Sequence, residues 1–335
     1  MRKVATVLLL AGLACAPAHA NDSTAELSTG GLVFVKNDDI EMRAEDLYIS
    51  TTEIRVRYRF FNRTGRDVTV RVAFPMPEIK VEHQDQDVAV PTDDPVNLLG
   101  FTTRSNGRAV QALVEQRVTA GGTDRTDFLT GLGIPLAPHA RSTGEALDRL
   151  PRNRQDELVR LKLAEVEEYD AGKGMERHLA PRWSLRTTFH WQQTFPAQQE
   201  TLIEHRYKPS VGGSVATAIG AGFAKGEPWH ADTLRKYCVE RDILNALDRA
   251  RRAKGSDTAP FSEERIDYIL KTGANWSGPI RDFRLVVDKG RPENMISFCG
   301  QGVRKIGPTQ FEMRKTNFTP QGNLSVLILK PLPKE

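Results

Sequence analysis

The feature that most constrains the fold is a strict alternation of apolar and charged side chains in residues 53–61. Ile54, Val56, Tyr58 and Phe60 alternate with Arg55, Arg57 and Arg59. Successive side chains of a β-strand point to opposite faces, so this period of two predicts a strand with one buried side. A turn-forming segment follows, and residues 68–75 alternate again until Pro75 ends the pattern. Together the two segments predict an antiparallel hairpin.

Similar β-type patterns recur along the chain. They occupy residues 31–36, 46–50, 98–104, 109–118, 183–195 and 201–208, and several segments from residue 282 onward. An Asn-Gly turn at Asn106 indicates a hairpin between two of these segments. Residues 183–195 and 201–208 predict another hairpin, because both alternate and only a short turn separates them.

Helical spacing of apolar side chains appears between the β-type regions. Residues 154–171 and 231–253 have this pattern, and residues 263–270 predict a short third helix. We therefore expect an α+β fold with an antiparallel β-sandwich core, of one or two sandwiches, that carries helical insertions. The expected regions are a signal peptide at 1–20, an N-terminal β-sandwich region at 21–120, a helical insertion at 121–180, a β-hairpin returning to the sheet at 181–212, a helical region with Cys238 at 213–275, and a C-terminal β region with Cys299 at 276–335.

The N-terminus has the pattern of a secretory leader. Two basic residues precede a short apolar run, and Ala18-His19-Ala20 places small residues where a signal peptidase cleaves. We expect cleavage after Ala20. Lipidation of Cys15 is the alternative, but Gly12 stands where a lipoprotein signal usually has leucine. No later segment is long and apolar enough to cross a bilayer. We therefore expect a periplasmic or secreted protein without a transmembrane segment.

Two cysteines, Cys238 and Cys299, follow the expected leader. An even number of cysteines in an oxidising compartment favours a disulfide between them. Such a bond would close a loop of about 60 residues and contribute about 4 kcal/mol in the chain-entropy model. Two separate buried thiols are the alternative.

The charge and the motifs exclude several classes of function. The formal net charge of +4 is small, whereas a nucleic-acid binder normally has a larger and more clustered basic excess. The sequence also lacks the common motifs of serine hydrolases, zinc peptidases and nucleotide-binding proteins. We therefore predict no catalytic residue, no cofactor and no nucleic-acid partner.

Two places in the sequence could hold a metal ion. His190 and His205 would face each other in one register of the second hairpin, but a register shifted by one residue matches the apolar faces better and separates them. Acidic residues between 38 and 46 could bind calcium, although a solvated turn explains them as well. We predict no metal site at either place.

A third candidate site is a basic face of the first hairpin. The arginines predicted to share this face are Arg55, Arg57, Arg59 and Arg71. Such a face could bind an anionic polymer of the cell envelope. It could instead only keep a strand soluble, which is the favoured interpretation.

Several blocks of the sequence, in order, resemble the bacterial domain-of-unknown-function family 4424. They include VTVRVAFPMP, FHWQQTFPAQQETLIEHRYKPSVGG, KYCVERDILNAL and NWSGPIRDFRLVVDKGRPENMISFCG. The resemblance runs from about Asn21 to the C-terminus and implies a secreted bacterial protein whose role is unassigned. It implies no catalytic residues. The blocks around Cys238 and Cys299 resemble the paired cysteines of that family.

The leading functional hypothesis is a non-enzymatic periplasmic protein that binds an unidentified envelope component or protein. The alternative is a cell-envelope hydrolase whose site is assembled only in the fold. Two carboxylates in one large cleft, one of them with a raised pKa, would favour the hydrolase. A cleft without such a pair would favour binding.

Overall fold

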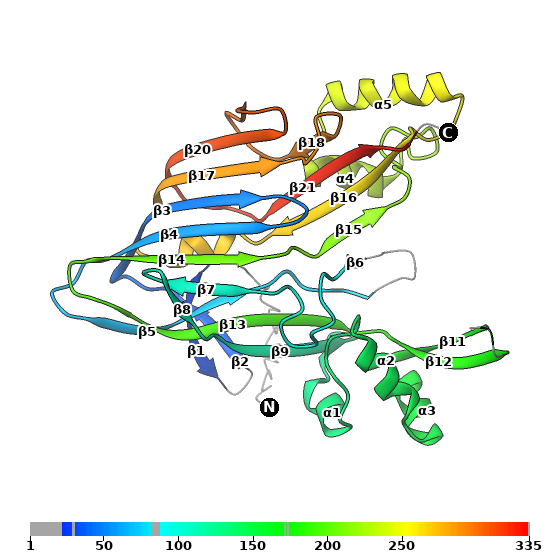
Figure 1. Ribbon diagram of the computed structural model, residues 1–335, viewed down its shortest axis with the longest axis horizontal. Helices are drawn as coiled ribbons and strands as arrows, with labels where there is room; N and C mark the ends of the chain where they lie inside the picture. The colour runs from blue at the N-terminus through cyan, green and yellow to red at the C-terminus, as the bar shows by residue number, and fades with distance from the viewer. Residues whose placement is uncertain (1–21, 29–30, 82–87, 171, 173, 334–335) are drawn as a thin grey trace, which may run out of the picture.

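Strands are the main secondary structure of the described residues and form four sheets there (Figure 1). The computed structural model describes residues 22–28, 31–81, 88–170, 172 and 174–333. The fold is mainly β, and the helices lie in the connections between strands. The predicted signal peptide and Cys15 lie outside the described residues.

The largest sheet has eight strands. In spatial order they are β19 (Arg304–Lys305), β20 (Gln310–Phe318), β17 (Ile280–Asp288), β3 (Ile40–Ile49), β4 (Ile54–Asn62), β14 (Glu200–Tyr207), β7 (Thr102–Ser105) and β8 (Arg108–Val110). The pair β3–β17 is parallel and the other neighbours are antiparallel. The sheet is therefore mixed, and a strand near the N-terminus lies beside one near the C-terminus.

The second sheet has six strands. Their order is β10 (Thr123–Asp124), β9 (Leu113–Ala120), β13 (Ser184–Phe195), β5 (Val68–Pro75), β1 (Ser23–Ser28) and β2 (Gly31–Val35). Aromatic rings connect its inner face to that of the eight-stranded sheet. Phe60 and Phe195 have ring centroids 5.7 Å apart, and Trp191 and His205 lie 5.4 Å apart. The larger hydrophobic core contains side chains of both sheets, and of the five-stranded sheet and the helical region as well.

The predicted hairpin of residues 53–75 is wrong in its pairing, although both strands exist. β4 belongs to the eight-stranded sheet and β5 to the six-stranded sheet. The buried side chain of Asn62 explains the crossing, because its Nδ2 donates to the carbonyl of Arg66 at 2.7 Å and to that of Phe195 at 2.8 Å. These bonds direct the chain away from β4 and toward the second sheet.

The second predicted hairpin is wrong for the same reason. Residues 181–212, expected to return to one sheet as a hairpin, contribute β13 to the six-stranded sheet and β14 to the eight-stranded sheet. At both predicted hairpins the chain thus passes from one sheet to the other between the two strands. The register argument for His190 and His205 has no basis, because their strands do not pair.

The third sheet has five strands and carries two helices. Its order is β18 (Met295–Phe298), β21 (Leu324–Pro331), β16 (Phe261–Tyr268), β15 (Val211–Ser214) and β6 (Val88–Ala89), and the helices are α4 (Pro228–Tyr237) and α5 (Arg241–Lys254). The predicted helix over 263–270 is wrong, since these residues lie mostly in β16. The helix predicted over 231–253 is two helices, because Cys238 has a φ of 50° and its left-handed backbone ends α4. Cys238 and Cys299 form a disulfide with Cα atoms 5.0 Å apart.

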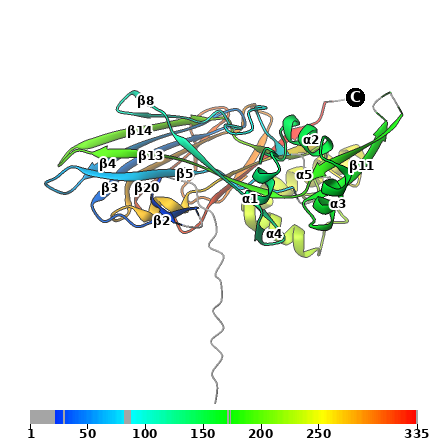
Figure 2. The ribbon, with the colours of Figure 1, turned by 90° about the horizontal axis from the view of Figure 1, so that it is seen from below.

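The remaining elements form a helical region and a projecting hairpin. They are α1 (Thr126–Gly131), α2 (Arg141–Asp148), α3 (Arg152–Arg160), β11 (Ala164–Asp170) and β12 (Met175–Pro181). The helix predicted over 154–171 is therefore wrong beyond Arg160. β11 and β12 form a separate two-stranded sheet, the arm, which packs on α2 and α3 and extends away from the larger sheets (Figures 1 and 2). No helix in the described part of the chain has the length and hydropathy needed to cross a bilayer.

Candidate functional site

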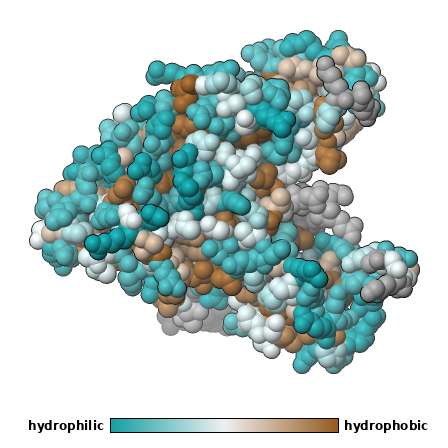
Figure 3. Space-filling model, viewed as in Figure 1, coloured by the Kyte–Doolittle hydropathy of each residue, from teal (hydrophilic) through white to brown (hydrophobic). Residues whose placement is uncertain are grey.

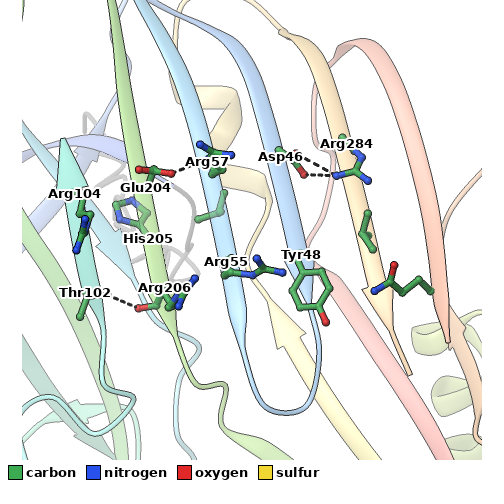
Figure 4. Close-up of a pocket in the computed structure, with 13 residues that line it drawn as sticks. Asp46, Tyr48, Arg55, Arg57, Thr102, Arg104, Glu204, His205, Arg206 and Arg284 are labelled. Carbon is green, nitrogen blue, oxygen red and sulfur yellow. Dashed lines mark hydrogen bonds and ion pairs between the residues drawn. The ribbon is translucent and has the colours of Figure 1, made fainter. Parts of the chain in front are cut away.

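The outward face of the eight-stranded sheet contains a hollow of about 790 Å³. The arginines that line it are Arg55, Arg57, Arg104, Arg206 and Arg284, and they come from β4, β7, β14 and β17 (Figure 4). Along β4 the residues on either side of Arg55 and Arg57 point inward and are buried, as the alternation of residues 53–61 predicts. The hollow is therefore lined by solvent-facing side chains of adjacent strands.

Strand register places five charged residues in one line across the sheet. The line, which we call the charged row, consists of Arg104, Glu204, Arg57, Asp46 and Arg284, and each residue is the direct cross-strand neighbour of the next. Positive and negative side chains alternate along it. Directly opposed residues of opposite charge stabilise neighbouring strands.

The carboxylates of the charged row hold two of its three arginines. Arg57 Nε lies 2.8 Å from Glu204 Oε1, and Arg284 Nη1 lies 3.1 Å from Asp46 Oδ1. Arg284 also donates to Glu312 Oε1 at 2.8 Å, a hydrogen bond that raises the pKa of Arg284. Among the described residues Arg104 has neither an ion pair nor a side-chain hydrogen bond. The end of the row at Arg104 thus presents a cation that no carboxylate neutralises.

A second group of side chains lies beside the charged row. Arg55 and Arg206 are cross-strand neighbours, and both contact Glu53, at 2.9 Å and 3.0 Å. The Glu53 carboxylate therefore forms ion pairs with two guanidinium groups. The Arg55 guanidinium also covers the ring of Tyr48, 4.4 Å from its centroid. Five arginines and two carboxylates, Asp46 and Glu204, line the hollow. Glu53 and Glu312 also pair with three of these arginines, so the excess of positive charge is one arginine.

The four arginines predicted to share one face occupy different places. Arg55 and Arg57 line the hollow, and Arg59 lies further along β4, 4.0 Å from Glu200. Arg71 lies on β5 in the six-stranded sheet and is not part of this surface. The arginines on β7, β14 and β17 were missed, because only strand pairing brings them beside β4.

The hollow does not contain the pair of carboxylates expected of a hydrolase. Burial raises the pKa of Asp22, although His205 opposes the shift, but this carboxyl group is enclosed between the sheets. Its Oδ1 lies 2.9 Å from His205 Nε2, and neither side chain has exposed surface. Asp46 and Glu204, which do line the hollow, hold arginines in place. The hydrolase alternative therefore has no support.

The candidate metal ligands are dispersed. His190 and His205 lie on strands of different sheets, and the acidic residues of segment 38–46 face separate partners, as shown by the pairing of Glu41 with Arg43. Within the described ranges, no three histidine, cysteine or acidic side chains come together as a metal site. The face shown in Figure 3 is mostly hydrophilic, with apolar side chains scattered over it. Charged side chains make up most of the residues that line the hollow, so charge is the main property that it offers to a ligand.

Comparison with known proteins identifies one family. The model of the family described as a domain of unknown function, DUF4424, matches residues 20–327. No curated protein matches the chain.

Two solved structures show limited similarity. A candidate nutrient-binding protein from Legionella pneumophila has 15% identity and a TM-score of 0.47, over 92% of this chain and 70% of that one. An M1 zinc metallopeptidase from Deinococcus radiodurans, a mutant with bound substrate, has 9% identity and a TM-score of 0.20, over 88% of this chain and 43% of that one. Similarities of this size carry no inference about ligand or activity.

Proposed function

We propose that this chain, which belongs to the DUF4424 family, is an exported binding protein that holds an anionic component of the cell envelope on its eight-stranded sheet. The observation that carries the proposal is the hollow lined by five arginines and only two carboxylates. An arginine presents several N–H donors in a planar fork that fits carboxylate, sulfate and phosphate groups. The hollow therefore suits an anion that offers several such groups.

The arrangement of the arginines also favours binding over a purely solvated surface. Glu204, Asp46 and Glu53 fix the positions of four guanidinium groups before any ligand arrives. Side chains that are already ordered lose less conformational entropy when they bind. Because they project from paired strands rather than from loops, the spacing between them is also fixed.

Export is supported by two further observations. The sequence before Asn21 has the features of a secretory leader, with the expected cleavage after Ala20. The disulfide between Cys238 and Cys299 belongs to a class of bond that persists in oxidising compartments. We also propose that the eight-stranded and six-stranded sheets form one β-sandwich, which the ring contacts between their inner faces support.

Titration calorimetry with dextran sulfate, and with neutral dextran as the control ligand, tests the proposal. We expect the chain without its leader to bind only the sulfated polymer. The triple variant R55Q/R57Q/R206Q should bind at least about tenfold more weakly, because it loses three charge-assisted contacts. The matched control R149Q/R152Q/R160Q removes the same charge from α3 and from the link between α2 and α3. Equal weakening by both variants, or no binding by the parent chain, contradicts the proposal.

A further inference from the structure

The charged row has a regular spacing. Its three arginines lie on β7, β4 and β17, which are every second strand of the series β7, β14, β4, β3, β17. Neighbouring strands are about 4.8 Å apart, so the backbone positions of these arginines repeat about every 10 Å. Arg314 on β20 lies directly opposite Arg284 and continues the positive charge by one more strand. The cations are thus spread along a line across the sheet and do not converge on one point.

The carboxylates between the arginines limit what any single position can bind. Glu204 and Asp46 reduce the attraction that Arg57 and Arg284 exert on one small anion. Exposed ion pairs each contribute little in water. Useful affinity therefore requires a ligand that contacts several positions at once, because linked contacts add their effects.

The side chains beside the row favour a polysaccharide over a nucleic acid. Proteins that bind single-stranded nucleic acid stack the bases on exposed aromatic rings. Tyr48 is the aromatic residue in the lining, and the Arg55 guanidinium covers its ring. Thr102 and Gln310 also line the hollow and offer a hydroxyl and an amide, groups that can form hydrogen bonds with sugar hydroxyls. Phosphates of a nucleic acid strand are also more closely spaced than these arginines.

We propose that the ligand is a linear acidic polysaccharide that lies along the charged row, across the strands. Its anionic groups would lie about 10 Å apart, over Arg104, Arg57 and Arg284. This inference rests on the proposed function, because it specifies the ligand of the same hollow. It goes further in requiring an extended chain with widely spaced charges.

A length series of hyaluronan oligosaccharides, from the disaccharide upward, tests the inference by titration calorimetry. These oligosaccharides carry a carboxylate on alternate sugars. We expect affinity to rise by about tenfold or more until the ligand reaches from Arg104 to Arg284, about 19 Å, and then to level off. R104Q should weaken the binding only of oligosaccharides that are long enough to reach residue 104. The matched control R108Q, on β8 outside the hollow, should bind all lengths as the parent chain does.

The other outcomes separate this inference from the proposed function. Affinity that is independent of length, or equal for inorganic phosphate, overturns the linear ligand but leaves an anion-binding hollow. Tighter binding of oligo-deoxythymidylate than of hyaluronan of similar length overturns the choice of polysaccharide. Binding of none of these anions, dextran sulfate included, contradicts both proposals.

Discussion

At the scale of single residues, the Asp22–His205 pair is the most consequential contact outside the hollow. Both side chains are fully buried, and Asp22 also accepts a hydrogen bond at its carbonyl from Trp276. Removing one member of a buried hydrogen-bonded pair leaves the polar atom of the other without its partner. We expect Asp22→Ala to lower the free energy of unfolding by on the order of 3 kcal/mol, measured by urea denaturation. Glu26→Ala, on the exposed side of β1, should change it by less than about 0.5 kcal/mol. A loss no larger than that of the control would show that the pair contributes nothing.

At the scale of elements, the arm depends on one histidine for its attachment to α2. His178 Nδ1 lies 2.8 Å from Asp148 Oδ2, and the other oxygen of Asp148 accepts from the Leu179 amide. The hydrogen bond to Asp148 raises the pKa of His178 above that of a free histidine. The contribution of this hydrogen bond to stability is therefore complete below about pH 6.5. It is lost as the pH rises through the raised pKa that His178 has in the folded protein. As the pH rises and His178 loses its proton, amide hydrogen exchange, corrected for its intrinsic rate, should show decreasing protection of β12. The protection of β13 should not decrease. In His178→Gln the pH dependence should disappear; if it persists, another group controls the arm.

A helix or strand was predictable from the sequence where neighbouring residues determine it. The prediction was wrong where pairing with distant strands determines the structure. The alternation in residues 54–60 correctly predicts β4, because it depends only on neighbouring side chains. The spacing of residues 263–270 predicts a helix, but pairing of β16 with β15 and β21 and the bond from Thr217 to buried Glu263 stabilise a strand. The candidate site was predictable only on β4. Arg104 and the other arginines join it through registers that no local pattern contains.

At the scale of the whole molecule, the disulfide ties α4 to the end of β18. The bonded residues are 61 positions apart, and the loop between them includes α5, β16 and β17. We expect C238S/C299S to unfold at lower urea concentration, with a loss of about 4 kcal/mol from the chain-entropy model. The slope of the denaturation curve should increase, because the unfolded chain without the bond exposes more surface. Thiol titration of the denatured, unreduced chain without its leader should find no free thiol. Unchanged stability in the variant would show that the bond is dispensable.

The parallel pairing of β3 with β17 also bears on the order in which the molecule assembles. β4 follows β3 directly in the sequence, whereas β17 begins only at Ile280, so β3 can pair with β4 before it pairs with β17. Until then one edge of β3 is open. An open strand edge is a template for pairing with other chains. Four charged residues within β3, Glu41, Arg43, Glu45 and Asp46, make such pairing unfavourable during that time.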